Sequence, residues 1–236
     1  MKSDAAEEDL PRPRRRQGLF ARAARLVLWA VGLVLLWVAL LGLVNPPITY
    51  LMVREYRAHG TLEREWQSLE ALGSEIALAV AAAEDARFCE HVGFDLAAIQ
   101  EALGEEGRRR GASTISQQVA KNVFLWPDRS WLRKGLEAGF TVLIELFWSK
   151  RRIMEVYLNV AETGTGTFGA EAAARQAFGV GAGELSPRQA ARIAVTLPNP
   201  KARSAASPTD FLRRRAAAVM DGAATLRATG RADCFL

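Results

Sequence analysis

Two adjacent acids, Glu84 and Asp85, follow the apolar run Ala77–Ala83 and open the segment Glu84–Asp95. A carboxylate at the end of such a run is partly desolvated, which raises its pKa and makes it a better base. These residue types therefore suit proton abstraction from a hydroxyl group. A helix end that carries surface acids explains the same pattern, and the residues alone leave that plainer interpretation ahead.

Small hydroxyl and amide residues form a second segment, Gly111–Gln118, which Lys121 and Asn122 follow. Hydroxyls and amides at a helix start supply hydrogen-bond donors without bulk, and free backbone N–H groups at such a start suit phosphate. The segment therefore fits a phosphate site, although an ordinary helix N-cap again accounts for it without any ligand.

Two further segments combine charge with helical spacing. Arg133 and Lys134 beside the isolated acid Glu137 can hold a pyrophosphate and a divalent ion, or simply form a surface salt bridge. In Lys150–Asn159, one helical face carries residues at spacings of three and four, which favours packing. Glu155 points elsewhere on that helix, and we expect it to brace the site through hydrogen bonds.

The elements that must position these residues are helices. Prolines separate apolar-periodic stretches that are rich in Ala, Leu, Glu and Arg, and these residues favour helix. Ser186–Gln189 combines an N-cap serine, a proline at the first position and a glutamine at the third. No stretch alternates with period two, so the sequence predicts a mainly α domain. The expected helices are Leu62–Leu72, Ile76–Phe88, Leu96–Leu103, Ser116–Phe124, Trp131–Trp148, Lys150–Asn159, Gly169–Ala177, Pro187–Thr196 and Phe211–Arg227.

An uncharged apolar run, Leu26–Val44, precedes this domain. At ~1.5 Å per residue it is long enough for the ~30 Å hydrocarbon core of a bilayer. Six arginines lie in the fifteen residues before Leu26, whereas no Lys or Arg follows until Arg54. The positive-inside rule then predicts a cytoplasmic tail at 1–25, an uncleaved transmembrane helix at 26–44 and an extracytoplasmic domain at 45–236.

Composition excludes several classes of protein. Residues 1–25 hold seven basic and four acidic side chains, hence +3 of the formal +5, so the folded part lacks the clustered charge of a nucleic-acid binder. Two histidines and two distant cysteines give no zinc-ligand spacing. A disulfide between Cys89 and Cys234 is one alternative outside the cytoplasm, but the apolar helical context of Cys89 favours a small buried thiol.

The stretch 123–148 is unusually apolar and aromatic, with basic residues interleaved. It reads equally as ordinary core or as a face that enters the lipid interface, where Trp beside Arg or Lys is favoured. The sequence also leaves two structures possible for the tail after about Arg203, since its pattern fits both a packed and a loose segment.

Taken in this order, the four segments resemble the lysozyme-like peptidoglycan glycosyltransferases, and specifically their monofunctional biosynthetic type. The likeness covers roughly residues 60–205. The family patterns and their matches are E-D-x-x-F-x-x-H-x-G at Glu84–Gly93, G-x-S-T-I-T-Q-Q at Gly111–Gln118 with Ser116 for the usual Thr, R-K-x-x-E at Arg133–Glu137, and K-x-x-I-x-E-x-Y-L-N at Lys150–Asn159.

The resemblance implies a reaction and a set of roles. A sugar C4 hydroxyl of lipid II would attack the anomeric carbon of the growing chain with inversion, and undecaprenyl pyrophosphate would leave. Glu84 would be the general base, and Glu137 would stabilise the pyrophosphate directly or through a divalent ion, Mg²⁺ or Mn²⁺, without an organic cofactor. The remaining residues would hold phosphates (Lys121, Arg129, Arg133, Lys134), line the cleft (Ser113, Gln117, Gln118, Asn122) or shape the motifs (Asp85, Phe88, His91, Gly93, Glu155, Tyr157, Asn159).

Partners and rivals follow from the same likeness. The expected partners are lipid II, the growing glycan chain, the cytoplasmic membrane and division or elongation proteins of the cell wall, with no nucleic acid. The sequence contains no S-x-x-K and no K-T-G, so we expect no transpeptidase activity. A lytic hydrolase would not need Arg133 and Lys134 together, and the intact pair Glu84 and Glu137 argues against a silent scaffold.

Overall fold

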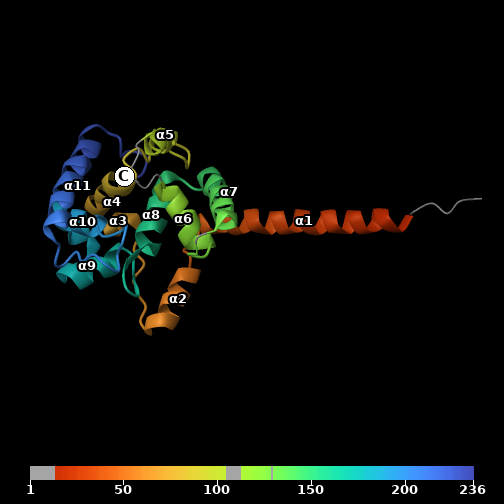
Figure 1. Ribbon diagram of the computed structural model, residues 1–236, viewed down its shortest axis with the longest axis horizontal. Helices are drawn as coiled ribbons and strands as arrows, with labels where there is room; N and C mark the ends of the chain where they lie inside the picture. Colours follow the sequence, from red (N-terminus) through yellow and green to blue (C-terminus); the bar gives the residue numbers. More distant parts are fainter. Residues whose placement is uncertain (1–13, 105–112, 129) are drawn as a thin grey trace, which may run out of the picture.

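The computed structural model describes residues 14–104, 113–128 and 130–236. A long helix, α1 (Arg14–Leu41), projects from a helical domain beside α7 (Trp131–Phe147), as Figure 1 shows. Its apolar part, Phe20–Leu41, is long enough to cross a membrane, and little of it is buried. The predicted span ran to Val44, but the helix ends earlier because residues 42–44 form a turn.

The domain is mainly helical, as the sequence predicts, and most predicted helices are present with small shifts of their ends. The serine at 186 accepts a hydrogen bond from the backbone N–H of Gln189 and forms the predicted capping box. The remaining helices are α2 (Tyr50–His59), α3 (Leu69–Leu72), α4 (Ser74–Glu84), α5 (Leu96–Gly104), α6 (Ile115–Phe124), α8 (Lys150–Val160), α9 (Ala170–Phe178), the 3-10 turn η1 (Ala182–Glu184), α10 (Pro187–Ala194) and α11 (Asp210–Ala228).

One predicted helix is wrong. Within Leu62–Leu72 only α3 is helical, and the chain before it forms β1 (Glu63–Arg64). This strand pairs in parallel with β3 (Thr167–Phe168), which pairs with β2 (Glu162–Gly164) in the order β1-β3-β2. Strands of two or three residues are too short to display alternation, so the small sheet left no period in the sequence.

Helix α4 lies at the centre of the core, packed against α10 and α11. Its residues from Ile76 to Ala81 are all buried, which explains why the sequence there is continuously apolar rather than amphipathic. The alanines allow the neighbouring helices to approach closely. Because α4 is held on several sides, its last residue, Glu84, has a fixed position at the edge of the core.

The domain caps the end of α1. The Trp148 indole Nε1 donates to the Val38 carbonyl at 2.8 Å, and Arg152 Nη2 donates to the carbonyls of Leu41 and Val44 at 3.1 and 2.9 Å. These bonds satisfy carbonyls that a helix end otherwise leaves open. Since Val38 is fully buried, the end of α1 is part of the domain rather than a free linker.

The aromatic stretch 123–148 is partly core and partly exposed, and its predicted entry into the lipid interface stays a prediction. Ile144 and Trp148 are buried, whereas Trp131, Leu132 and Leu146 expose 92%, 69% and 71% of their surface. The exposed set lies on α7, the helix that contacts α1. One face of α7 is therefore core, and the other is an apolar surface next to the candidate membrane helix.

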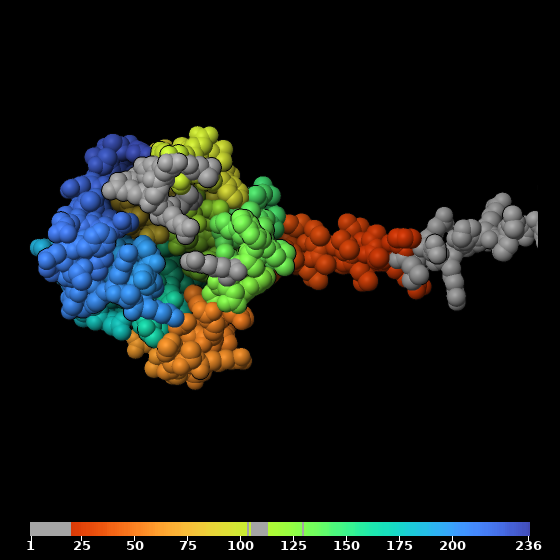
Figure 2. All heavy atoms as spheres, viewed as in Figure 1, coloured from red at the N-terminus to blue at the C-terminus, as the bar shows by residue number. Residues whose placement is uncertain are grey.

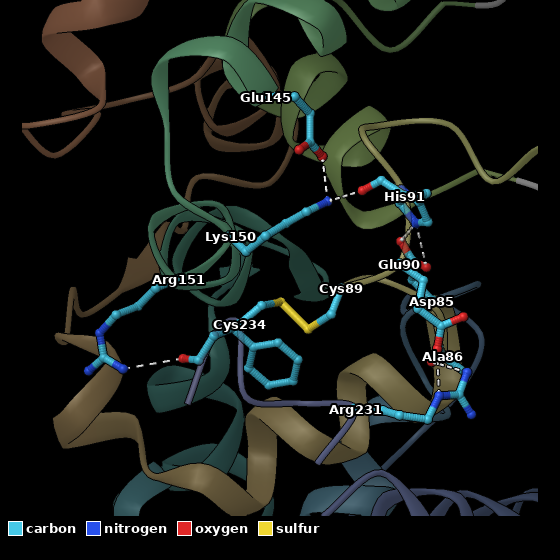
Figure 3. The surroundings of a disulfide bond; sticks show 11 residues. Asp85, Ala86, Cys89, Glu90, His91, Glu145, Lys150, Arg151, Arg231 and Cys234 are labelled. Carbon is cyan, nitrogen blue, oxygen red and sulfur yellow. Dashed lines mark hydrogen bonds and ion pairs between the residues drawn. A yellow bond between two sulfur atoms is a disulfide. The ribbon is translucent and has the colours of Figure 1, made fainter. Parts of the chain in front are cut away.

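The tail after Arg203 packs on the domain, which settles the alternative that the sequence left open. It forms α11 and then a short segment that ends at Leu236. The expectation that Cys89 is a free buried thiol is wrong, because Cys89 and Cys234 form a disulfide across 145 residues of sequence (Figure 3). The helical context of Cys89 ended at Glu84, and the residue lies in a half-buried loop.

Candidate active site

Glu84 is the last residue of α4, and its carboxylate is largely buried. Its Oε2 accepts a hydrogen bond from the neutral amide of Gln118 at 2.9 Å. Burial raises the pKa of Glu84, an effect that Gln118 and the charges of Arg215, Lys121 and Arg203 offset in part. A carboxylate with a raised pKa is a stronger base, so the residue has the environment that the sequence predicted.

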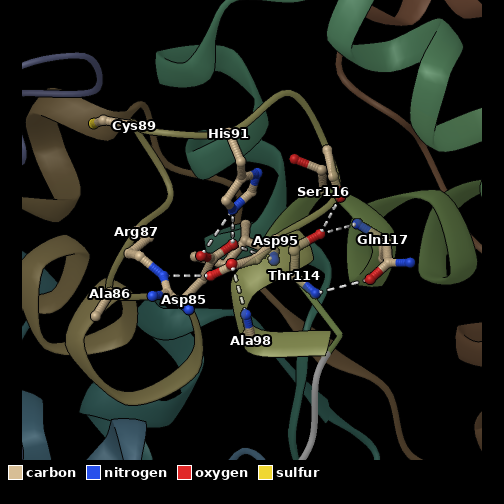
Figure 4. A network of polar contacts seen from close by, with 12 residues as sticks. Asp85, Ala86, Arg87, Cys89, His91, Asp95, Ala98, Thr114, Ser116 and Gln117 are labelled. Carbon is tan, nitrogen blue, oxygen red and sulfur yellow. Dashed lines mark hydrogen bonds and ion pairs between the residues drawn. The ribbon is translucent and has the colours of Figure 1, made fainter. Parts of the chain in front are cut away.

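Asp85 has a structural role in the loop that follows (Figure 4). Its Oδ2 accepts from the backbone N–H of Ile115 at 3.0 Å, and its Oδ1 lies 3.0 Å from His91 Nε2. Gly93 has a φ of 82°, and a Cβ there would lie 2.7 Å from Thr141 Cγ2. These contacts fold the loop against α6 and α7, which gives Asp85, His91 and Gly93 a structural role.

The start of α6 is a closed cap rather than a phosphate site. Thr114 and Gln117 form a capping box, and the N–H of Ile115 is taken by Asp85. The predicted free amides are therefore occupied at these positions. The side chain of Gln117 is buried within the cap, whereas Gln118 is the amide that reaches Glu84, so the predicted place of Gln117 in the cleft lining stays a prediction.

Glu137 is buried between two cations. Arg133 Nη1 donates to its Oε2 at 2.5 Å, and Lys134 Nζ contacts Oε1. The surface salt bridge that served as the plainer interpretation does not apply, because the side chain of Glu137 is only 4% exposed. Lys121 lies nearby, and burial lowers its pKa while the charges of Glu137 and Glu84 oppose that shift. Arg129, the fourth predicted phosphate ligand, lies outside the described residues.

The donor set at Glu137 does not fit a divalent ion held by the protein. Both carboxylate oxygens already bond cations, and no group of metal-ligating side chains among the described residues includes Glu137. Asp85, His91 and Asp95 do lie within ligand distance of one another. However, Asp95 binds Arg87 at 2.8 Å and the Ala98 N–H at 2.9 Å, so that cluster is a network of internal hydrogen bonds.

Figure 2 shows a hollow between the blue carboxyl-terminal part and the green α6–α7 side, and two separate cavities border the candidate site residues. The first has a volume of about 440 Å³, and Glu84, Ser113 and Arg231 are among its lining residues. The second has a volume of about 310 Å³, and Lys121 and Asn122 are among its lining residues. Gln118, which bonds Glu84, and Lys121 both lie on α6, and α6 packs against α7, which carries Glu137, so the base and the cation cluster belong to one region.

The remaining motif residues brace the fold. Glu155 Oε2 accepts from the Leu69 N–H at 3.1 Å, so its predicted bracing role falls on α3 rather than on the cleft. Tyr157 donates to Gln118 Oε1 at 3.3 Å, and Asn159 bonds both backbone groups of Gln67 at 2.9 Å. Phe88 is 1% exposed and fills the core below the loop.

Sequence reasoning missed two cations that act on Glu84 and one acid that braces the neighbouring motifs. Arg203 and Arg215 act on Glu84 from the carboxyl-terminal side, where we assigned no site residue. Glu145 accepts from Ser116 and from Lys150 Nζ at 2.8 Å, and Lys150 also donates to the His91 carbonyl at 2.7 Å. The run of three arginines, Arg213–Arg215, was the available signal for Arg215.

Comparison with known proteins identifies relatives along most of the chain. A family model described as transglycosylase matches residues 52–224. The biosynthetic peptidoglycan transglycosylase of Jannaschia sp. (strain CCS1) is 52% identical over 204 residues, 86% of this chain and 85% of that protein. The protein of that name from Pseudomonas aeruginosa is 52% identical over 212 residues, 85% and 90% of the two chains. That from Rhodospirillum centenum is 47% identical over 231 residues, 96% and 97% of the two chains.

Proposed function

Because the chain belongs to the peptidoglycan transglycosylase family, we propose that it polymerises lipid II into β-1,4-linked glycan strands and releases undecaprenyl pyrophosphate. One observation carries the proposal. A partly buried carboxylate with a neutral hydrogen-bond partner, Glu84, lies in the same region as a compact cluster of cations around Glu137. A glycosyl transfer from a pyrophosphate needs both parts.

Glu84 is the proposed general base. A sugar C4 hydroxyl is a weak nucleophile, and a positioned base contributes ~10²–10⁴-fold to the rate of such a step. The carboxylate would take the hydroxyl proton while the oxygen attacks the anomeric carbon. Gln118 holds the carboxylate in one orientation without neutralising its charge, since it donates from an amide. Attack from that side displaces the pyrophosphate from the opposite face, which gives inversion.

The cation cluster is the proposed site of the leaving group. A departing pyrophosphate gains negative charge and needs neutralisation rather than a proton. Lys121, Arg133 and Lys134 would supply that charge, and Glu137 would hold Arg133 and Lys134 in place. A divalent ion would add the same neutralising charge to the pyrophosphate, but Glu137 does not fit as its protein ligand, so we derive no step through it.

We propose that α1 anchors the chain in the cytoplasmic membrane with residues 45–236 outside. The arginines before Leu26 favour a cytoplasmic amino terminus. The Cys89–Cys234 disulfide supports the same orientation, because disulfides persist in oxidising compartments. The exposed apolar face of α7 would then meet the lipid surface beside α1, at the depth where the headgroup of lipid II lies.

We also propose that the activity ends at polymerisation, because the sequence contains neither S-x-x-K nor K-T-G. Division or elongation proteins of the cell wall are the partners that an anchored polymerase would serve. The membrane and the lipid-linked substrate are its proposed immediate contacts.

The test is incubation of the detergent-solubilised protein with labelled lipid II, followed by digestion of the product with muramidase. Polymer that muramidase reduces to disaccharide units supports the proposal. Folded protein that consumes no lipid II in several detergents would point to a scaffold, and breakdown of pre-made glycan would point to a lytic enzyme. Either of those two results would overturn the proposed reaction.

A further inference from the structure

The last residues of the chain fold back onto the loop that follows Glu84 (Figure 3). The turn at Gly230, with a φ of 69°, directs the segment Arg231–Leu236 across this loop. Cys234 is joined to Cys89 by the disulfide, and Arg231 Nε donates to Glu90 Oε1 at 2.6 Å. We call Arg231–Leu236 the carboxyl-terminal latch.

The latch also reaches the core beneath the loop. Phe235 is 1% exposed, and its ring centroid lies 5.9 Å from that of Phe88. Arg151 of α8 donates to the Phe235 carbonyl at 3.2 Å and to the Leu236 carbonyl. A segment with a buried aromatic ring, a covalent bond and two tethering arginines is held as firmly as a core element.

The contacts of the latch with the loop fall immediately after Glu84. Asp85 is the C-cap of α4, and the latch bonds or packs against residues 86, 88, 89 and 90. On its inner side the loop is fixed by Asp85 to α6 and by Lys150 to the His91 carbonyl. The latch therefore closes the outer side of the loop, and its Arg231 lines the same cavity as Glu84.

We propose that the carboxyl-terminal latch, held by the Cys89–Cys234 disulfide, is a positioning element that keeps the loop after Glu84 closed and so sets the geometry and hydration of that carboxylate. The proposal rests on the proposed role of Glu84 as the base. It assigns a function in the reaction to a terminal segment outside the four sequence motifs and to the disulfide that joins this segment to Cys89, a variable position of the first motif.

The consequence for the reaction is specific to Glu84. Burial raises its pKa, against the opposing effects of Gln118 and Lys121 on α6, Arg215 on α11 and Arg203 before it. The buried phenol of Tyr157 on α8 donates to Gln118, the side chain that bonds Glu84. Because the loop is one wall of the cavity, its opening admits water to the carboxylate. A hydrated Glu84 has a lower pKa and is a weaker, less fixed base.

Reduction of the disulfide tests the latch in the intact chain. Dithiothreitol becomes its cyclic disulfide, and the Cys89–Cys234 bond takes up two electrons and two protons to give two thiols. Cys234 is exposed, so the reagent reaches it in the folded protein. The double variant Cys89→Ser with Cys234→Ser gives the same state without reagent and must itself be insensitive to dithiothreitol.

A pair of arginine variants separates the latch from general stability. Arg231→Gln removes a partly exposed ion pair to the loop residue Glu90. Arg227→Gln removes a comparable pair from the end of α11 to Glu75, at the opposite end of α4 from Glu84. Circular dichroism melting establishes that each protein is folded at the assay temperature, and only Arg231→Gln is expected to change the reaction.

We expect opening of the disulfide to lower kcat about tenfold, within the ~10²-fold that a 1 Å misplacement can produce, with KM changed less than about twofold. The acid limb of the pH–rate profile is expected to move to lower pH. Hydrogen exchange gives a second readout without substrate, since the Phe88 and Glu90 amides donate within the loop at 3.1 and 2.7 Å. Both should exchange faster, whereas amides of α10 should not.

An unchanged kcat, acid limb and loop exchange after reduction, with only a lower melting temperature, would reduce the latch to a staple of stability and overturn the proposal. Failure of the proposed function is distinguishable. In that case the oxidised wild type makes no polymer, or Glu84→Gln makes as much as the wild type. The exchange measurement would still decide whether the latch holds the loop closed.

Discussion

Glu84 and Glu137 are both largely buried carboxylates in one region of the molecule, but their surroundings differ. Glu84 accepts a hydrogen bond from a neutral amide, and burial raises its pKa. Glu137 contacts two cations, with one of its oxygens on each. The charge of Glu84 is thus left available for a proton, whereas that of Glu137 is used within the protein.

This difference separates two kinds of catalytic need. A base must lose solvation without losing its charge to a neighbouring cation, since a tightly paired carboxylate is a weak base. A leaving-group site must hold like charges close together, and Arg133 and Lys134 repel each other unless an anion lies between them. In the proposed reaction, glutamate therefore serves as a base at position 84 and as a support for cations at position 137, because the neighbouring side chains differ.

The largest expected effect comes from Glu84→Gln. Loss of the base should lower polymerisation of lipid II by about 10²–10⁴-fold, whereas retention of shape keeps substrate binding. The same change should raise the free energy of unfolding at pH 8 by on the order of 1 kcal/mol, the scale of one buried polar group. Because its pKa is raised, the wild-type carboxylate destabilises the fold only while it is charged. The stability advantage of the variant should therefore shrink as the pH falls and Glu84 becomes protonated.

The two readouts of this variant are initial rates with labelled lipid II and urea unfolding at several pH values. A near wild-type rate would show that another group takes the proton. A marked loss of stability at pH 8 would contradict the view that the Glu84 charge is poorly compensated.

The matched change at the other acid, Glu137→Gln, should have the opposite effect on stability. It leaves Arg133, with a side chain only 11% exposed, without its anionic partner. Removal of one partner from a buried pair costs about 3–5 kcal/mol. We expect a lower urea midpoint and a loss of activity of about 10²-fold, because the cations are no longer held together.

The double variant Arg133→Met with Glu137→Met controls for this interpretation, because it removes both charges and should recover stability but not activity. If Glu137→Gln were as stable as the wild type, the ion pair would be loose in solution and the contrast with Glu84 would fail.

The sequence predicts the two acids and the desolvation of Glu84, but not every side chain that contacts them. The order of the motifs assigns the chain to a family and so predicts the roles of Glu84 and Glu137. The helix-favouring composition predicts most of the helices. Gln117 and Gln118 show the limit: neighbours on a helix point about 100° apart, but spacing does not say which one faces the cleft. The structure gives Gln117 to the N-cap and Gln118 to Glu84.

Features that depend on long-range packing were not predictable. Cys89 and Cys234 meet only because α11 returns the chain to the loop, and the charge of Arg215 on α11 affects the pKa of Glu84 for the same reason. The strands Glu63–Arg64 and Thr167–Phe168 are too short to leave a pattern. In each case the sequence contains the residue types, but the fold decides which residues contact each other.

A smaller effect should come from Gln118→Leu, which removes the neutral donor that partly stabilises the Glu84 charge. Without it the pKa of Glu84 rises further, so the acid limb of the pH–rate profile should move to higher pH. We expect the rate to fall a few-fold more at pH 6 than at pH 8, because a larger share of Glu84 is protonated at the lower pH. Tyr157→Phe is the control, because it removes the hydroxyl that bonds Gln118 and leaves the amide on Glu84.

The smallest expected effect concerns metal binding to the cation site. Calorimetric titration of the substrate-free protein with Mn²⁺ should give no heat attributable to a site at Glu137, because both oxygens of that carboxylate contact Arg133 and Lys134. An incoming divalent ion would have to displace two cations and would be repelled by them. Glu137→Gln should therefore leave the titration unchanged. If the wild type bound Mn²⁺ and this variant did not, Glu137 would exchange its cations for a metal. The charge of Glu137, like that of Glu84, would then be available to a ligand, and the contrast between the two acids would fail.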